Sequence, residues 1–195
     1  MNPVQAFWAS QTKERKMSQL ERYESAGSPE EILKFIRLGG GPAMGTTLEK
    51  YGRFVLTSLT PRSRGGASET GYDHLLPLAG RSPLFVEQKS SGLWSALGSP
   101  DDYKWQHVEP DHKWNFLLLC GIGYKEVNFW VMDRPTYDAL RGLGKITNQG
   151  NKAGDSSEGT WFSYQNVKDS LVRITTDGEL LAWAHKTYAI EKKEE

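Results

Sequence analysis

The stretch GYDHLLPLAGRSPLFVEQKSSG, residues 71–92, decides how the rest of the chain is arranged. It predicts two short strands joined by a tight turn, with Asp73 on the first strand. An apolar run then brings the second strand into the core, and the chain continues directly as Glu87, Gln88 and Lys89. Because side chains alternate between the faces of a strand, Glu87 and Lys89 point one way and Gln88 the other. A carboxylate and an ammonium beside each other at the end of a buried strand indicate a functional site.

The residue types gathered here suit metal-assisted phosphodiester hydrolysis. Mg²⁺ prefers hard oxygen ligands and usually takes only one or two carboxylates, the rest being water and substrate phosphate. Asp73 and Glu87 would supply two carboxylates from neighbouring strands, and the backbone carbonyl of Gln88 is a candidate third ligand. Lys89 beside them would orient or deprotonate the attacking water and offset charge on the attacked phosphate.

Asp73, followed after 13 residues by Glu-x-Lys at residues 87–89, resembles the motif of the PD-(D/E)xK nuclease superfamily. This is the superfamily of many restriction enzymes and of phage and repair nucleases. The resemblance implies a restriction-endonuclease-like α/β fold with an αβββαβ core, in which helices flank a mixed central sheet. It also implies that Asp73 and Glu87 hold Mg²⁺, for which Mn²⁺ can substitute, and that Lys89 assists the nucleophile. The chain departs from the motif at Tyr72, where the family pattern has Pro.

Two further residues match positions of this family. Many members carry a Glu on the helix before the first acidic strand, and Glu49 lies beside the apolar stripe of a helix expected over residues 43–59. A solvated helical carboxylate is the alternative interpretation of Glu49. Gln106 matches a Gln or Lys that a later helix presents to the site, on a helix expected to begin at Ser99-Pro100. His107, next to it, is interpreted as a surface or capping residue rather than a catalytic one.

Candidate DNA contacts occur in three places: the loop 61–69, the residues after the Glu-x-Lys triplet, and the glycine-rich stretch 146–159. Arginine, lysine, serine and amide side chains bond phosphates and base edges. Solvated loops are the alternative for the first and last of these segments. The candidates are Arg62, Arg64, Ser90, Ser91, Asn148, Gln149, Asn151 and Lys152.

Length and composition indicate one soluble globular domain. The 195 residues include 7 Trp, 8 Tyr and 7 Phe, enough for a packed core. We expect an N-terminal helical arm over 1–42, a nuclease-like core over 43–135, and a loop, a strand and helices over 136–195. The formal net charge is zero, which argues against a broad basic surface but not against an acidic cleft. Cys120 lies in an apolar run, which predicts a buried thiol.

Other elements are expected from start signals and apolar runs. Ser28 followed by Pro29 predicts an N-cap and a helix, and Asp133 predicts another N-cap. Residues 114–122 predict a strand buried on both faces, with further strands at 126–132 and 161–164. The last 30 residues are expected to be helical, with a break near 176–178. With neither a signal peptide nor an apolar segment of about 20 residues, we expect a cytoplasmic protein without a membrane span.

Together these features predict a Mg²⁺-dependent endonuclease acting on double-stranded DNA, of the restriction, phage or repair kind. A single site cuts one strand at a time, so we expect a homodimer, the commonest symmetric assembly. Two other classes stay open. One is a non-catalytic nucleic-acid-binding or regulatory protein of the same fold, and the other is a structural or interaction protein in which the motif is a coincidence.

Overall fold

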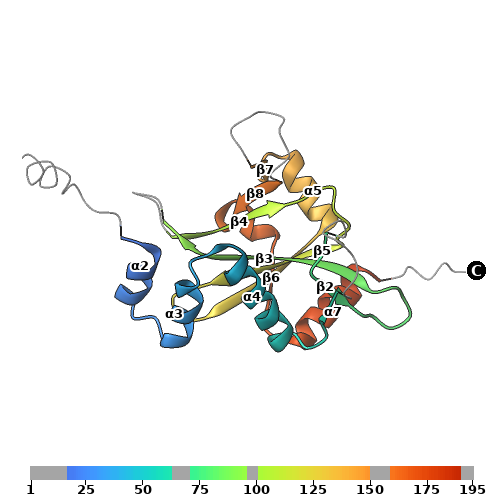
Figure 1. Ribbon diagram of the computed structural model, residues 1–195. Coiled ribbons are helices and arrows are strands. Elements are labelled where there is room, and N and C mark those ends of the chain that lie inside the picture. The colour runs from blue at the N-terminus through green and yellow to red at the C-terminus, as the bar shows by residue number, and fades with distance from the viewer. Residues whose placement is uncertain (1–16, 63–70, 96–100, 150–158, 190–195) are drawn as a thin grey trace, which may run out of the picture.

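The structure, a computed structural model, describes residues 17–62, 71–95, 101–149 and 159–189. These residues form an α/β protein with a mixed, open sheet of nine strands and six α-helices (Figure 1). The strands are β1 (Thr60–Pro61), β2 (His74–Leu76), β3 (Leu84–Trp94), β4 (Asp102–Val108), β5 (Phe116–Ile122), β6 (Val127–Asp133), β7 (Thr147–Asn148), β8 (Thr160–Ser163) and β9 (Val172–Ile174). The helices are α2 (Gln19–Ser25), α3 (Glu30–Arg37), α4 (Gly41–Val55), α5 (Arg134–Gly142), α6 (Tyr164–Val167) and α7 (Asp177–Thr187), with a short 3₁₀ helix, η1 (Lys168–Ser170).

Strand β3 is the centre of the sheet. The strand order is β7-β8-β4-β3-β5-β6-β9, and the β1-β2 pair joins through β2, which is also bonded to β3. β5 runs parallel to β3 along residues 86–92 of one edge. On the opposite edge, β2 pairs antiparallel with residues 84–86 and β4 pairs antiparallel with residues 93–94. The middle of this second edge therefore lies between two strands that diverge from it.

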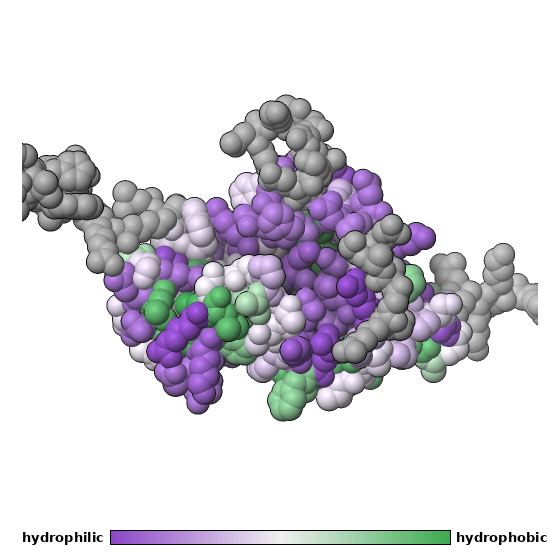
Figure 2. Space-filling model, in the orientation of Figure 1, coloured by the Kyte–Doolittle hydropathy of each residue, from purple (hydrophilic) through white to green (hydrophobic). Residues whose placement is uncertain are grey.

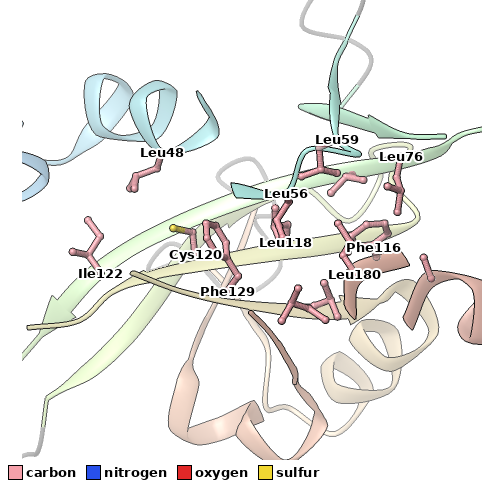
Figure 3. Packing of buried hydrophobic residues seen from close by; sticks show 14 of the residues in the cluster. Leu48, Leu56, Leu59, Leu76, Phe116, Leu118, Cys120, Ile122, Phe129 and Leu180 are labelled. Atoms are coloured by element: carbon pink, nitrogen blue, oxygen red, sulfur yellow. The ribbon is translucent and has the colours of Figure 1, made fainter. Parts of the chain in front are cut away.

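The predicted buried strand is confirmed as β5, all seven of whose residues are buried. Alternate side chains enter two separate cores, as the twofold period of a strand requires. Leu118 and Cys120 pack in the first core, among residues of α4 and α7 (Figure 3). Leu117 and Leu119 pack in the second, with residues of β4, β8 and α5. The thiol of Cys120 is buried as expected, and burial raises its pKa to about 12.

Helix α4 forms one wall of the region beside β3. It begins at Gly41 and ends at Val55, slightly before the range expected from the sequence. Gly40 and Gly41 have positive φ angles of 78° and 65°, which glycine adopts without strain, so the chain can turn sharply from α3 into α4. Leu48 faces the first core and is fully buried.

The helix predicted to begin at residue 99 is wrong, because residues 102–108 form strand β4. Trp105 and Val108 are fully buried in the second core, whereas Gln106 between them is exposed. Pairing with β8 and β3 supplies the backbone hydrogen bonds that a helix would otherwise make. In the described part of the connection from β3 to β5, a strand thus takes the place of the helix in the expected αβββαβ order.

Smaller differences concern helix ends and the C-terminal part. Ser28 does not cap α3, whose N-cap is Pro29 without a side-chain hydrogen bond. The cap of α5 is confirmed, since Asp133 accepts a hydrogen bond from the Thr136 amide at 3.1 Å. Strand β9 was not predicted, because its three residues lie within a segment expected to be helical. In the part of the chain that the structure describes, no helix has the length and apolar character needed to cross a membrane.

Candidate active site

A cavity of about 710 Å³ lies at the middle of the free edge of β3, bordered by α4, β4 and the start of β8. On the side of the molecule that faces the viewer in Figure 2, the middle of the surface is largely hydrophilic. Many of the residues predicted from the sequence line this one cavity. They are Glu49, Asp73, Gln88, Lys89, Ser90, Ser91, Gln106 and Gln149.

Glycines form part of the α4 wall of the cavity. Gly41, Gly45 and Glu49 recur at intervals of four residues and so lie along one face of the helix. Open space surrounds the positions where side chains of Gly41 and Gly45 would begin. A bulky ligand can therefore approach the helix backbone next to the Glu49 carboxylate.

Asp73 is held against β3 by two hydrogen bonds, one from its backbone amide and one to its carboxylate. The Asp73 amide donates to Val86 O at 2.9 Å, and the Gln88 amide donates to Asp73 Oδ2 at 2.8 Å. The sequence predicted Asp73 on a strand. Asp73 lies just before β2 instead. The N–H and C=O of one strand residue point to the same edge, so the Gln88 carbonyl also lies on the Asp73 side, consistent with its expected position.

Glu87 and Lys89 point to the same face, as predicted, and form an ion pair of 2.6 Å between Nζ and Oε1. Glu87 is only 7% exposed and lies outside the residues that line the cavity. Burial and the negative charge of Asp73 raise the pKa of Glu87 to about 7, against the opposing effect of Lys89. Burial and Asp73 also raise the pKa of Glu49, which Arg53, Arg62 and Lys89 lower. The three carboxylates are therefore close enough to repel one another.

The residues that could hold a divalent cation are carboxylates. Among the described residues, no three or more His, Cys, Asp and Glu side chains form a metal-binding group, so a closed site of the zinc type is not built here. Mg²⁺ needs only one or two carboxylates. Asp73 and Glu87, with Glu49 nearby, supply this donor set and gather negative charge that a cation would offset.

We expect Glu87 to make stability depend on pH in metal-free buffer. Its pKa is raised from 4.5 in the unfolded chain to about 7, so the folded protein binds the extra proton between these values. The contribution of Glu87 to the free energy of unfolding is fully present below pH 4.5 and is lost as the pH rises through 7. Glu87→Gln should therefore remove up to about 3 kcal/mol of the change in unfolding free energy with pH. Urea unfolding of both proteins at pH 5 and pH 8 measures it. An exposed control, Glu31→Gln, should track the wild type, and equal pH slopes for wild type and Glu87→Gln would contradict the expectation.

A buried histidine orients Gln88. Arg53 Nη1 lies 3.0 Å from His74 Nδ1, and His74 Nε2 lies 3.0 Å from Gln88 Oε1. A guanidinium only donates, so Nδ1 of His74 accepts and its proton sits on Nε2. The side-chain oxygen of Gln88, Oε1, consequently accepts from His74. The side-chain nitrogen of Gln88, Nε2, lies 3.5 Å from Ser90 Oγ and can donate into the cavity.

This chain of contacts predicts the state of His74. Burial lowers the pKa of His74 and the Arg53 charge adds to this, against the opposing effects of the Gln88 hydrogen bond and the Asp73 charge. We expect a neutral imidazole with its proton on Nε2 at pH 7 and above. Nitrogen-15 NMR of the histidine ring reports the tautomer directly. Arg53→Met should raise the pKa of His74, and an Nδ1–H pattern in the wild type would contradict the assignment.

The other predicted residues divide into four groups. Gln106 reaches the cavity from strand β4 instead of a helix. Ser91 serves the fold, since its hydroxyl donates to Gly92 O and accepts from the Lys104 amide, which holds the β3–β4 junction. Arg62 and Asn148 lie outside the cavity lining, although Arg62 is near enough to affect Glu49. Arg64, Asn151 and Lys152 lie outside the described residues.

Sequence reasoning missed several residues around the cavity. His74 directly follows Asp73, and the pairing of β2 with β3 brings it to Gln88, while the packing of α4 brings Arg53 to His74. Trp94, Lys104 and Trp161 form the far end of the cavity. The alternation of residues 103–108 was a signal that could have placed Lys104 and Gln106 on one face of a strand.

Comparison of the chain with protein-family models, with characterised proteins and with solved structures finds no match.

Proposed function

We propose that this protein is a Mg²⁺-dependent DNA endonuclease of the restriction-endonuclease-like type. The observation that carries the proposal is the proximity of Asp73, Glu87, Lys89 and Glu49. Glu87 pairs with Lys89 and is affected by the charge of Asp73, while Asp73, Lys89 and Glu49 line one cavity. These are the residues that the PD-(D/E)xK resemblance assigns to the site. If the motif were a coincidence, these side chains would be expected to lie far apart.

The arrangement of elements supports the same proposal. Helix α4 precedes the hairpin of β2 and β3, and the strand bearing the Glu-x-Lys triplet is followed by a parallel neighbour, β5. A helix followed by this hairpin agrees with the first part of the expected αβββαβ order. The strand β4 in the connection to β5 is the departure from it.

Each residue has a distinct role in the proposed reaction. Bound Mg²⁺ would polarise the scissile phosphate and activate water for attack, and Asp73 and Glu87 would hold the ion. Lys89 is 20% exposed and lies 2.6 Å from Glu87, where its ammonium can contact a phosphate oxygen and offset developing charge. Gln88 and Gln106 offer amide donors from the two sides of the cleft. Mn²⁺, which also accepts carboxylate ligands, is an expected substitute.

The substrate is expected to be double-stranded DNA. One cavity receives one scissile phosphate, so cutting both strands at one place requires two copies of the site. A homodimer with twofold symmetry, acting on a palindromic sequence, satisfies this requirement most simply.

A non-catalytic DNA-binding protein is the second candidate, favoured by one observation. Lys89 already pairs with Glu87, so the buried carboxylate is compensated without any metal. In that case the triplet would serve the fold and DNA would bind without being cut.

Cleavage of plasmid and phage DNA distinguishes the two candidates. The purified protein is incubated with DNA in Mg²⁺ and in EDTA, beside Lys89→Ala and an exposed control, Lys145→Ala. Discrete fragments that require Mg²⁺, persist in Lys145→Ala and disappear in Lys89→Ala support a sequence-specific endonuclease. Nicking or a smear supports a nuclease without restriction-type specificity. A mobility shift without cleavage overturns the proposal in favour of the binding protein.

A further inference from the structure

The end of the cavity formed by β4 and β8 is aromatic. Lys104 Nζ lies 3.3 Å from the ring centroid of Trp94 and 5.2 Å from that of Trp161. Both indoles therefore face one small space, which the ammonium of Lys104 reaches. Trp94 is 41% exposed, so a large apolar ring stands at the surface of a polar cleft. All three residues line the same cavity as Asp73 and Lys89.

A strained bulge places polar groups beside these rings. The pairing of β4 with β8 shifts between Trp105 and Val108, and His107 has a positive φ of 56°. Such a conformation is costly for a residue other than glycine, and bulges of this kind occur next to functional sites. Gln149 Oε1 accepts from the His107 amide at 3.0 Å, so that Gln149 Nε2 lies 3.3 Å from the His107 ring. Gln106, His107 and Gln149 thus bring amide and imidazole groups to the aromatic end of the cavity.

This combination suits a nucleobase better than a phosphate. Stacking a base on an aromatic ring is worth more than an exposed contact between a lysine and a ring, so a base can displace the ammonium from Trp94. Lys104, released, is long enough to contact the backbone phosphate of the same nucleotide. Amide side chains bond base edges. Inside a duplex both faces of a base are covered by its neighbours, so only an unpaired base can stack on these rings.

We propose that Trp94 and Trp161 form a binding site for one unpaired nucleobase of the substrate DNA, with Lys104 neutralising its phosphate. The proposal rests on the DNA endonuclease function and adds how the substrate is engaged. Trp94 lies five residue steps after Lys89 along β3, a span of about 16 Å, or about five nucleotide steps of 3.4 Å along one strand. The stacked base therefore lies within about five nucleotides of the scissile phosphate.

Binding of DNA with one base missing tests this site. Duplex oligonucleotides that contain the cleavage site are prepared with a single abasic nucleotide at each successive position near the scissile phosphate. If plasmid DNA is not cleaved, a random duplex with one mismatch at its centre serves instead. Affinity is measured in EDTA, so that the readout does not depend on cleavage. The proteins are the wild type, Trp94→Leu, Trp161→Leu, Lys104→Gln, and Phe54→Leu as an exposed aromatic control outside the cavity.

We expect Trp94→Leu and Trp161→Leu each to weaken binding of the intact duplex about 10-fold, while Phe54→Leu leaves it unchanged. For the wild type, removing one particular base should cause a similar loss, and the tryptophan variants should bind that abasic duplex as well as the wild type does. Lys104→Gln should reduce the salt dependence of binding. The inference is overturned if no abasic position weakens wild-type binding, or if the tryptophan variants lose affinity equally for intact and abasic DNA. Base-dependent binding without cleavage by Mg²⁺ would refute the endonuclease while leaving the base site in place.

Discussion

Asp73→Asn is expected to lower the rate of DNA cleavage by about 10³-fold, because one ionic metal contact in such a site stabilises the transition state by several kcal/mol. Asparagine has the same shape, and its side-chain oxygen can still accept the Gln88 amide now bonded to Asp73 Oδ2 at 2.8 Å. The hairpin should therefore keep its geometry while the site loses one negative charge. A second consequence follows from the same charge. Since Asp73 raises the pKa of both Glu87 and Glu49, both pKa values should fall in this variant.

Three measurements separate the loss of the metal contact from a general disturbance. Calorimetric titration with Mg²⁺ in the absence of DNA should show weaker binding to Asp73→Asn than to the wild type. Circular dichroism and urea unfolding should show an intact fold. The exposed variant Asp169→Asn, which makes the same chemical change on η1, should cleave at the wild-type rate. Full activity of Asp73→Asn would remove Asp73 from the site.

Leu118→Ala is expected to cost about 2–5 kcal/mol of unfolding free energy, the usual range for a fully buried leucine in a core. Leu118 is 0% exposed and lies in the middle of β5, opposite Gln88 in the parallel pair. Its side chain fills the first core between the sheet and helices α4 and α7, so its removal leaves a cavity that β5, paired on both sides, cannot close by moving.

The chain offers a matched control for this change. Leu143 is 73% exposed just after α5, so Leu143→Ala removes the same atoms from a position in contact with water. The urea midpoint of Leu118→Ala should lie well below that of the wild type. The midpoint of Leu143→Ala should lie close to that of the wild type. Leu118 and Gln88 are paired across β3 and β5, so Leu118→Ala is also expected to disturb the position of Gln88 in the site. Equal midpoints for the two leucine variants would contradict the assigned core.

The sequence by itself determined the local parts of this protein. Alternation placed Glu87 and Lys89 on one face of a strand, and a continuous apolar run predicted β5 as buried on both sides, because both patterns depend only on the period of an extended chain. The Asp133 cap and the helix after it were likewise local, since the capping side chain and its backbone partner are three residues apart.

Tertiary structure alone decided the rest. A start signal typical of a helix stands at residues 99–102, yet residues 102–108 form β4 because strands β3 and β8 supply hydrogen-bond partners from distant parts of the chain. The same pairing brought Lys104 between Trp94 and Trp161, which no short-range pattern could foresee. The pKa of Glu87 also depends on tertiary structure, since burial and the charge of Asp73 act through space. Local patterns specify which residues can form a site, and long-range packing specifies which of them meet.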